Sequence, residues 1–202
     1  MNVKVLSFSK LVKVISDQKR KKKRIILCHG VFDLMHIGHI KYFQEAKEMG
    51  DVLVVTITPD RFVNKGPNRP VFNENLRAES IAALGVVDYI SINEWSSAIE
   101  TIKALKPDLY VKGPDYKDYS QDLTGNILLE ENAVKSVGGE IAFTSDITFS
   151  SSALINQHIS QFSNEQQQYI DDLRIKYKFN DIFKYVDSLT KLKVLLVGEV
   201  II

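Results

Sequence analysis

The chain has 202 residues, 45% of them apolar and 25% charged, with a formal net charge of +1. These ordinary values indicate a globular protein with one domain and a smaller extension. A net charge this close to zero excludes a strong general attraction to nucleic acid or to a membrane surface, so we expect neither as a partner. The single cysteine excludes an internal disulfide, and no apolar run is long enough to cross a bilayer, so we expect a cytoplasmic location.

Apolar periodicity and turn residues predict helices that alternate with strands. Strands are predicted at residues 24–29, 51–58, 86–91, 108–112 and 140–143. Helices are predicted at residues 9–21, 40–49, 73–84 and 96–105, and in a segment ending at 137. Gly50 and Gly85 are the expected C-terminal caps, and Pro107 ends a helix. This alternation implies right-handed crossovers and an α/β fold with a doubly wound parallel sheet of Rossmann-like type.

The last forty residues differ from the rest of the chain. Residues 163–191 carry an apolar stripe among polar side chains, which predicts one or two amphipathic helices. Residues 193–202 read as a new strand with a glycine turn. We therefore expect a domain over residues 1–161, a helical linker over 162–192 and the first strand of a further domain over 193–202. The stripe is too apolar to be left in water, which favours a homodimer. Alternatively, the last strand completes the first domain or a dimer.

Two histidines form the most informative motif of the chain. His36, Gly38 and His39 lie between a predicted strand and a predicted helix. A helix N-terminus offers unpaired N–H groups and a positive dipole end, and glycine lets a phosphate approach the backbone closely. Each imidazole adds a donor where charge would grow on phosphorus. A metal site would need a third ligand; His29 and His158 form no evident cluster with the pair, so no dedicated metal site is expected.

Residues 28–39 read Cys-His-Gly-Val-Phe-Asp-Leu-Met-His-Ile-Gly-His. This segment resembles the signature of the cytidylyltransferase-like nucleotidyltransferases, and most closely that of the glycerol-3-phosphate cytidylyltransferases and of the nucleotidyltransferase domain of ADP-heptose synthase. The similarity continues in order through residues 64–71, 76–79, 87–89 and 111–116 and ends near residue 155.

The resemblance implies transfer of CMP or AMP from CTP or ATP to a sugar phosphate or polyol phosphate. Pyrophosphate would leave, and the product would serve surface glycan synthesis. The last ten residues resemble the first strand of ribokinase-like sugar kinases, which implies a fused kinase domain. Two alternatives stay open: another adenylyltransferase of the superfamily, and a nucleotide-binding or assembly module of a bifunctional kinase fusion.

The resemblance also implies site residues, position by position. The implied catalytic residues are His36, His39, Lys65 and Arg77. The implied nucleotide-binding residues are Gly30, Val31, Phe32, Asp33, Gly38, Lys112, Asp115, Ser150, Ser151 and Ser152. The implied acceptor-binding residues are Asp60 and Arg69. Mg²⁺ is expected with the triphosphate, held mainly by phosphate and water.

Several of these residues also have a purely structural interpretation. Arg77 could form a surface salt bridge with Glu74 or a neighbour. Asp33 and Asp60 could cap turns, Lys112 could be solvated, and Ser150 to Ser152 could cap a helix. Ser145 and Thr148 stand where the family often has an arginine and a glycine, which disfavours the cytidylyltransferases that use the arginine.

Overall fold

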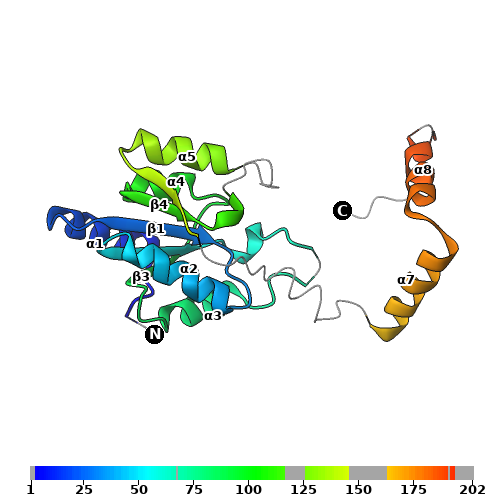
Figure 1. The fold of residues 1–202 in the computed structure, drawn as a ribbon, viewed down its shortest axis with the longest axis horizontal. Coiled ribbons are helices and arrows are strands. Elements are labelled where there is room, and N and C mark those ends of the chain that lie inside the picture. Colours follow the sequence, from blue (N-terminus) through cyan, green and yellow to red (C-terminus); the bar gives the residue numbers. More distant parts are fainter. Residues whose placement is uncertain (1–2, 67, 117–125, 146–162, 191, 194–202) are drawn as a thin grey trace, which may run out of the picture. The chain divides into compact units, whose positions relative to one another are not determined.

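The computed structural model describes residues 3–66, 68–116, 126–145, 163–190 and 192–193 (Figure 1). The chain divides into two compact units, Met1–Ile159 and Ser160–Ile202. The first unit is built on a five-stranded parallel sheet, and the described part of the second contains two helices. None of the helices in the described residues has the length and apolar character needed to span a membrane.

The sheet of the first unit has the strand order β3-β2-β1-β4-β5. Its strands are β1 (Ile25–Gly30), β2 (Val52–Ile57), β3 (Tyr89–Ile92), β4 (Leu109–Lys112) and β5 (Glu140–Phe143). The central strand, β1, pairs in parallel with β2 on one side and with β4 on the other. The chain first builds the sheet toward β3 and then crosses to β4, so the direction changes between β1 and β4. The predicted doubly wound parallel sheet is thus confirmed.

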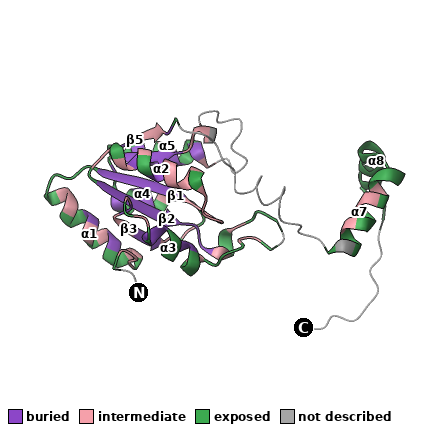
Figure 2. Ribbon diagram, turned by 60° about the horizontal axis from the view of Figure 1, so that its bottom comes forward, coloured by how far each residue is buried: buried purple, intermediate pink, exposed green. Residues whose placement is uncertain are grey.

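Helices cover both faces of the sheet. The side chains of β1 alternate between the two faces, so each face has apolar residues to bury. Ile26 and Cys28 pack on the face covered by α2 (Ile37–Glu48) and α3 (Glu74–Ala82). Ile25 and Leu27 pack on the opposite face. That face is covered by α1 (Phe8–Arg20), α4 (Ile99–Leu105) and α5 (Ile127–Ser136). Figure 2 shows the resulting buried strands between helices whose outer sides are exposed. Two short 3-10 helices, η1 (Asp60–Phe62) and η2 (Pro114–Tyr116), follow β2 and β4.

Several predicted boundaries were wrong. Helix α2 begins at Ile37 instead of residue 40, because His36 caps it by accepting a hydrogen bond from the Gly38 N–H. Gly50 does not serve as a left-handed cap; it is needed for packing, since a Cβ there would lie 2.6 Å from Ile26 Cδ1. Helix α3 ends at Ala82, before Gly85.

The described residues of the second unit form α7 (Asn164–Lys176) and α8 (Phe179–Leu189). Ser163 and Gln166 form a reciprocal capping box at the start of α7, which explains where this helix begins. Apolar side chains between the helices line a groove of about 480 Å³; they include Leu173, Tyr177, Ile182, Val186 and Leu189. The strand predicted at 193–202 lies outside the described residues except for Lys193.

Candidate active site

Most of the predicted site residues gather at the carboxyl ends of the parallel strands. His36 follows β1, Asp60 and Lys65 follow β2, and Lys112 ends β4. Parallel strands place all their carboxyl ends at one edge of the sheet (Figure 1), and ligands of doubly wound folds bind at that edge. This edge is therefore the candidate active site.

The two motif histidines form a stacked pair at the start of α2. His36 is the N-cap, and its Nδ1 accepts a hydrogen bond of 3.1 Å from the Gly38 N–H. His39 lies three residues further on the same helix face, and the ring centroids are 3.9 Å apart with 27° between the planes. Because His36 Nδ1 is an acceptor, the proton of its neutral ring lies on Nε2. Gly38 thus acts through its N–H in orienting His36.

Burial makes both imidazoles neutral at pH 7. It lowers the pKa of His36 below its ordinary value. The pKa of His39 falls to about 4, because burial, His36 and Lys65 disfavour its cationic form while Asp33 partly opposes them. His39 Nδ1 is buried and has no hydrogen-bond partner among the described residues. The pair therefore presents neutral rings that can donate hydrogen bonds to a phosphate.

The turn after β1 packs against the histidine pair. Phe32, in the left-handed region with φ 50°, meets the edge of His39 with ring centroids 5.6 Å apart and also packs against Phe43. Gly30 makes room for this ring, since a Cβ there would lie 3.0 Å from Phe32 Cζ. In this structure Gly30 and Phe32, both predicted to bind nucleotide, shape the turn.

The structure buries Asp33 and Arg69, predicted to bind nucleotide and acceptor, against each other. Arg69 Nε donates to Asp33 Oδ2 at 3.0 Å, and the two side chains are 3% and 1% exposed. Asp33 also accepts from the N–H groups of Val71 and Phe72. Its carboxylate is therefore occupied by protein donors. Arg69 Nη2 is buried without a partner in the described part of the chain.

Arg77, implied from sequence to be catalytic, is not the surface residue of the alternative interpretation, because its side chain is 1% exposed. Its guanidinium donates to the carbonyls of Val31, Thr58 and Phe72 and to Asp60 Oδ1. The Val31 carbonyl and the Asp60 carboxylate, both predicted to bind substrates, are thus engaged by Arg77. Its nearest ionic partner is Asp60, not Glu74.

Lys112 was predicted to face the nucleotide phosphates, yet it is also paired inside the protein. Its Nζ lies 3.4 Å from Glu130 Oε2 and 4.2 Å from the centre of the Tyr116 ring. Burial alone would raise the pKa of Glu130, but Lys112, His29 and hydrogen bonds from Ala98 and Tyr110 lower it below its usual value. Glu130 is therefore an anion that neutralises Lys112.

Sequence reasoning missed Glu130. A usable signal was present, because Glu130 lies in helical phase with Ile127, Ala133 and Val134, all of which are buried. The neighbouring Leu128 and Leu129 are each 53% exposed. An acidic residue in phase with the buried face of a helix indicates a partner cation in the core.

Lys65 differs from the other predicted cations. Arg69, Arg77 and Lys112 each have a carboxylate partner, whereas no ion pair joins Lys65 to another described residue. Desolvation is the largest effect that lowers the pKa of Lys65. Repulsion from Arg69 lowers this pKa further, and attraction to Asp33 opposes both effects. The structure thus leaves Lys65 as the cation best suited to meet a phosphate. The side chain of Asp115 and all of Ser150, Ser151 and Ser152 lie outside the described part of the chain.

The fold and the paired histidines define a doubly wound α/β protein with its candidate site at the carboxyl edge of the sheet. A family model described as cytidylyltransferase-like matches residues 27–183, so the chain belongs to the cytidylyltransferase-like family. The Bifunctional protein HldE of Syntrophotalea carbinolica is 36% identical over 130 residues, which are 63% of this chain and 25% of that protein. HldE of Nitratiruptor sp. is 40% identical over 129 residues, 63% of this chain and 28% of that protein. The chain thus spans about a quarter of the length of these relatives.

Solved structures agree on the fold. The lipopolysaccharide core biosynthesis protein from Thermoplasma volcanium GSS1 is 28% identical with a TM-score of 0.52, covering 62% of this chain and 99% of that one. A pantoate-beta-alanine ligase from Francisella tularensis has a TM-score of 0.55, covering 91% of this chain and 85% of that one. At 17% identity it shows the fold alone.

Proposed function

We propose that this chain is a nucleotidyltransferase that moves AMP or CMP from ATP or CTP to a sugar phosphate or polyol phosphate. The stacked neutral pair of His36 and His39 at the start of α2 carries the proposal. Membership of the cytidylyltransferase-like family supports it, as do relatives named HldE and a structural relative named for lipopolysaccharide core biosynthesis. The proposed product is an activated sugar for a surface glycan.

In the proposed reaction an oxygen of the acceptor phosphate attacks the α-phosphorus of the nucleoside triphosphate. The bond from this phosphorus to the oxygen bridging the α- and β-phosphates breaks, and pyrophosphate leaves. Neutral His36 and His39 donate hydrogen bonds to the phosphate oxygens as charge grows on them. Lys65 and the N-terminus of α2 add positive potential, so positioning and charge account for the rate.

We propose that Mg²⁺ binds at this site together with the triphosphate and not through a set of protein ligands. Among the residues that the structure describes, no three His, Cys, Asp or Glu side chains are grouped to hold a metal ion. Asp33 and Asp60 already accept hydrogen bonds from protein donors. We therefore propose that phosphate oxygens and water hold the ion, which supplies counter-charge.

Pyrophosphate release tests the proposal. The chain is mixed with ATP or CTP, Mg²⁺ and a panel of sugar and polyol phosphates, and we expect release with one nucleotide–acceptor pair. Replacing the second histidine, His39→Ala, should lower that rate by about two to three orders of magnitude, the effect of losing one preorganised donor. Nucleotide binding without turnover on any acceptor would favour the alternative of a binding or assembly module.

We also propose that the chain works beside a kinase domain in a longer cytoplasmic protein. Support comes from relatives named as bifunctional, of which the matched part is about a quarter.

The exposed apolar residues of α8, among them Phe179 at 76% and Phe183 at 56%, favour a homodimer through the second unit. Sedimentation of the full chain beside a version ending at Gln161 tests this; equal behaviour of both would exclude a tail-mediated dimer.

A further inference from the structure

We propose that Asp33 is a positioning residue that fixes the loop bearing Lys65 relative to the histidine pair. The Lys65 loop comprises the described residues 63–66 and 68, between η1 and the segment leading to α3. The inference rests on the proposed function only in giving Lys65 a phosphate to bind. It assigns Asp33 a role different from the nucleotide contact expected from sequence.

Asp33 holds the far end of the Lys65 loop. Its Oδ2 accepts from Arg69 Nε at 3.0 Å and from the Val71 N–H at 2.9 Å, and its Oδ1 accepts from the Phe72 N–H at 3.1 Å. The Asp33 side chain is buried, and Asp33 lies three residues before His36. One carboxylate thus joins the turn that carries the histidines to the segment directly after the loop.

Arg77 holds the near end of the same loop. Its guanidinium binds Asp60 in η1 and the Phe72 carbonyl, together with the Val31 carbonyl of the histidine turn. Asp60 and Glu74 exchange hydrogen bonds between their N–H groups and carboxylates, at 2.8 and 3.1 Å. Two buried side chains of opposite charge therefore anchor both ends of the loop to one turn.

The loop itself has few anchors between these ends. Residues 64–66 and 68 form no hydrogen bond with another described residue, and Gly66 has a φ of +99°. The position of Lys65 is therefore set by the anchors. A direct substrate role for Asp33 is disfavoured, because its oxygens already bind three N–H groups and an anion would repel a triphosphate.

Trypsin cleavage after Lys65 measures the anchoring without any substrate. Asp33→Asn turns one acceptor oxygen into an NH₂ group that faces protein donors. We expect the fragment that begins at Gly66 to appear at least about tenfold faster, the factor for losing one charge-assisted hydrogen bond. Arg69 is followed by Pro70, which blocks cleavage there. If Asp33→Asn does not fold, Arg69→Gln carries the same test, because it removes the charged donor and keeps the carboxylate.

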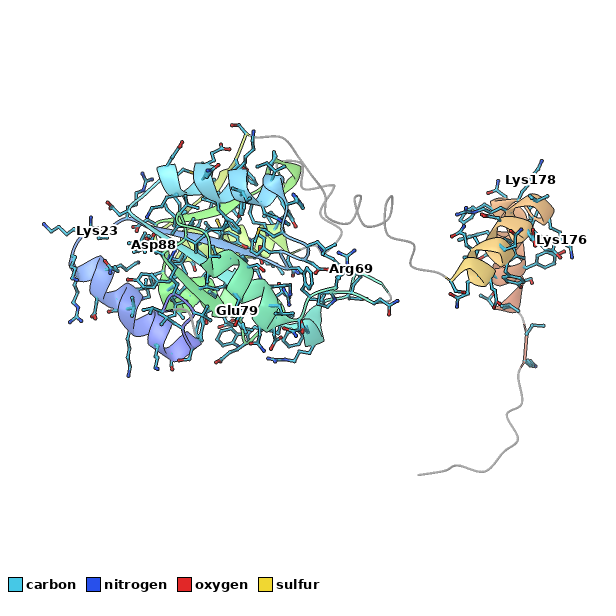
Figure 3. The ribbon with its side chains drawn as sticks, turned by 90° about the horizontal axis from the view of Figure 1, so that it is seen from below. Lys23, Arg69, Glu79, Asp88, Lys176 and Lys178 are labelled. Carbon is cyan, nitrogen blue, oxygen red and sulfur yellow. The ribbon has the colours of Figure 1, made fainter. Side chains whose placement is uncertain are left out.

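Asp88→Asn is the matched control. The Asp88 carboxylate also accepts from a backbone N–H, that of Leu53, and from the cation of Lys47. In Figure 3 Asp88 and Arg69 lie at opposite ends of the first unit. We expect Asp88→Asn to leave cleavage after Lys65 unchanged. Equal cleavage in wild type and Asp33→Asn would overturn the proposal.

A double-mutant cycle tests whether Asp33 acts through Lys65. Asp33→Asn should lower kcat/KM for nucleotidyl transfer about tenfold in the wild-type chain and less than about twofold in Lys65→Ala. The same loss in both backgrounds would overturn the positioning role. If the wild-type chain transfers no nucleotide, the proposed function fails, while the cleavage assay still decides the anchoring.

Discussion

Replacing Arg77 separates its structural role from the catalytic role that the sequence implies. Arg77→Met keeps most of the side-chain volume and removes all the donors that bind Val31, Thr58, Phe72 and Asp60. Breaking a buried ion pair by removing one partner costs about 3–5 kcal/mol. The Asp60 side chain is 35% exposed, so water compensates part of its lost partner and the lower end, about 3 kcal/mol, applies. For a domain of this size that loss lowers Tm by about 6–12 °C.

Thermal unfolding followed by circular dichroism measures this effect. Arg61→Met is the control, because Arg61 is exposed, stacks on Phe62 and donates to the Glu94 carbonyl, and its loss should change Tm by less than about 2 °C. A Tm of Arg77→Met equal to that of wild type, together with slower nucleotidyl transfer, would refute the reasoning. Arg77 would then act in catalysis, as the resemblance implies.

Three further outcomes are expected. Burial lowers the pKa of His29 to about 4, so the unfolded chain takes up a proton at this residue first, and the free energy of unfolding falls as pH drops from about 6.5 to 4. His29→Gln should reduce this pH dependence, which chemical denaturation at a series of pH values measures. Gly139→Ala places a Cβ 2.2 Å from the Pro107 carbonyl oxygen and should lower Tm by several degrees, whereas Gly85→Ala meets open space and should not. ATP or CTP with Mg²⁺ should slow tryptic cleavage after Lys65; a rate independent of nucleotide would exclude closure of this loop over the triphosphate.

The sheet could be predicted because its strands are encoded locally. Strand β2 is buried at all six positions, and a continuous apolar run in the sequence indicates such a strand. The strand at 140–143 was placed at its observed bounds. Helix starts were less accurate, because the capping of α2 depends on the conformation of one side chain, His36 Nδ1 facing the Gly38 N–H.

The charged residues show where sequence reasoning ended. The sequence identified the cations of the candidate site but not their ionic partners, which lie far away in the chain. Arg69 pairs with Asp33, Arg77 with Asp60 and Lys112 with Glu130. A cation at the carboxyl edge of a sheet looks the same in sequence whether it awaits a phosphate or neutralises a buried carboxylate. Only the fold distinguishes Lys65 from the other three.

The central position of β1 has a consequence for how heat inactivates this protein. The strand that leads into the histidine turn is hydrogen-bonded on both sides, so its amides should exchange with solvent only in global unfolding. Among its described residues, the Lys65 loop is hydrogen-bonded only at its ends, so it should open at a much lower free energy than β1. On warming, the proposed activity should therefore fade below Tm, while the histidine turn is still in place, and it should return on cooling.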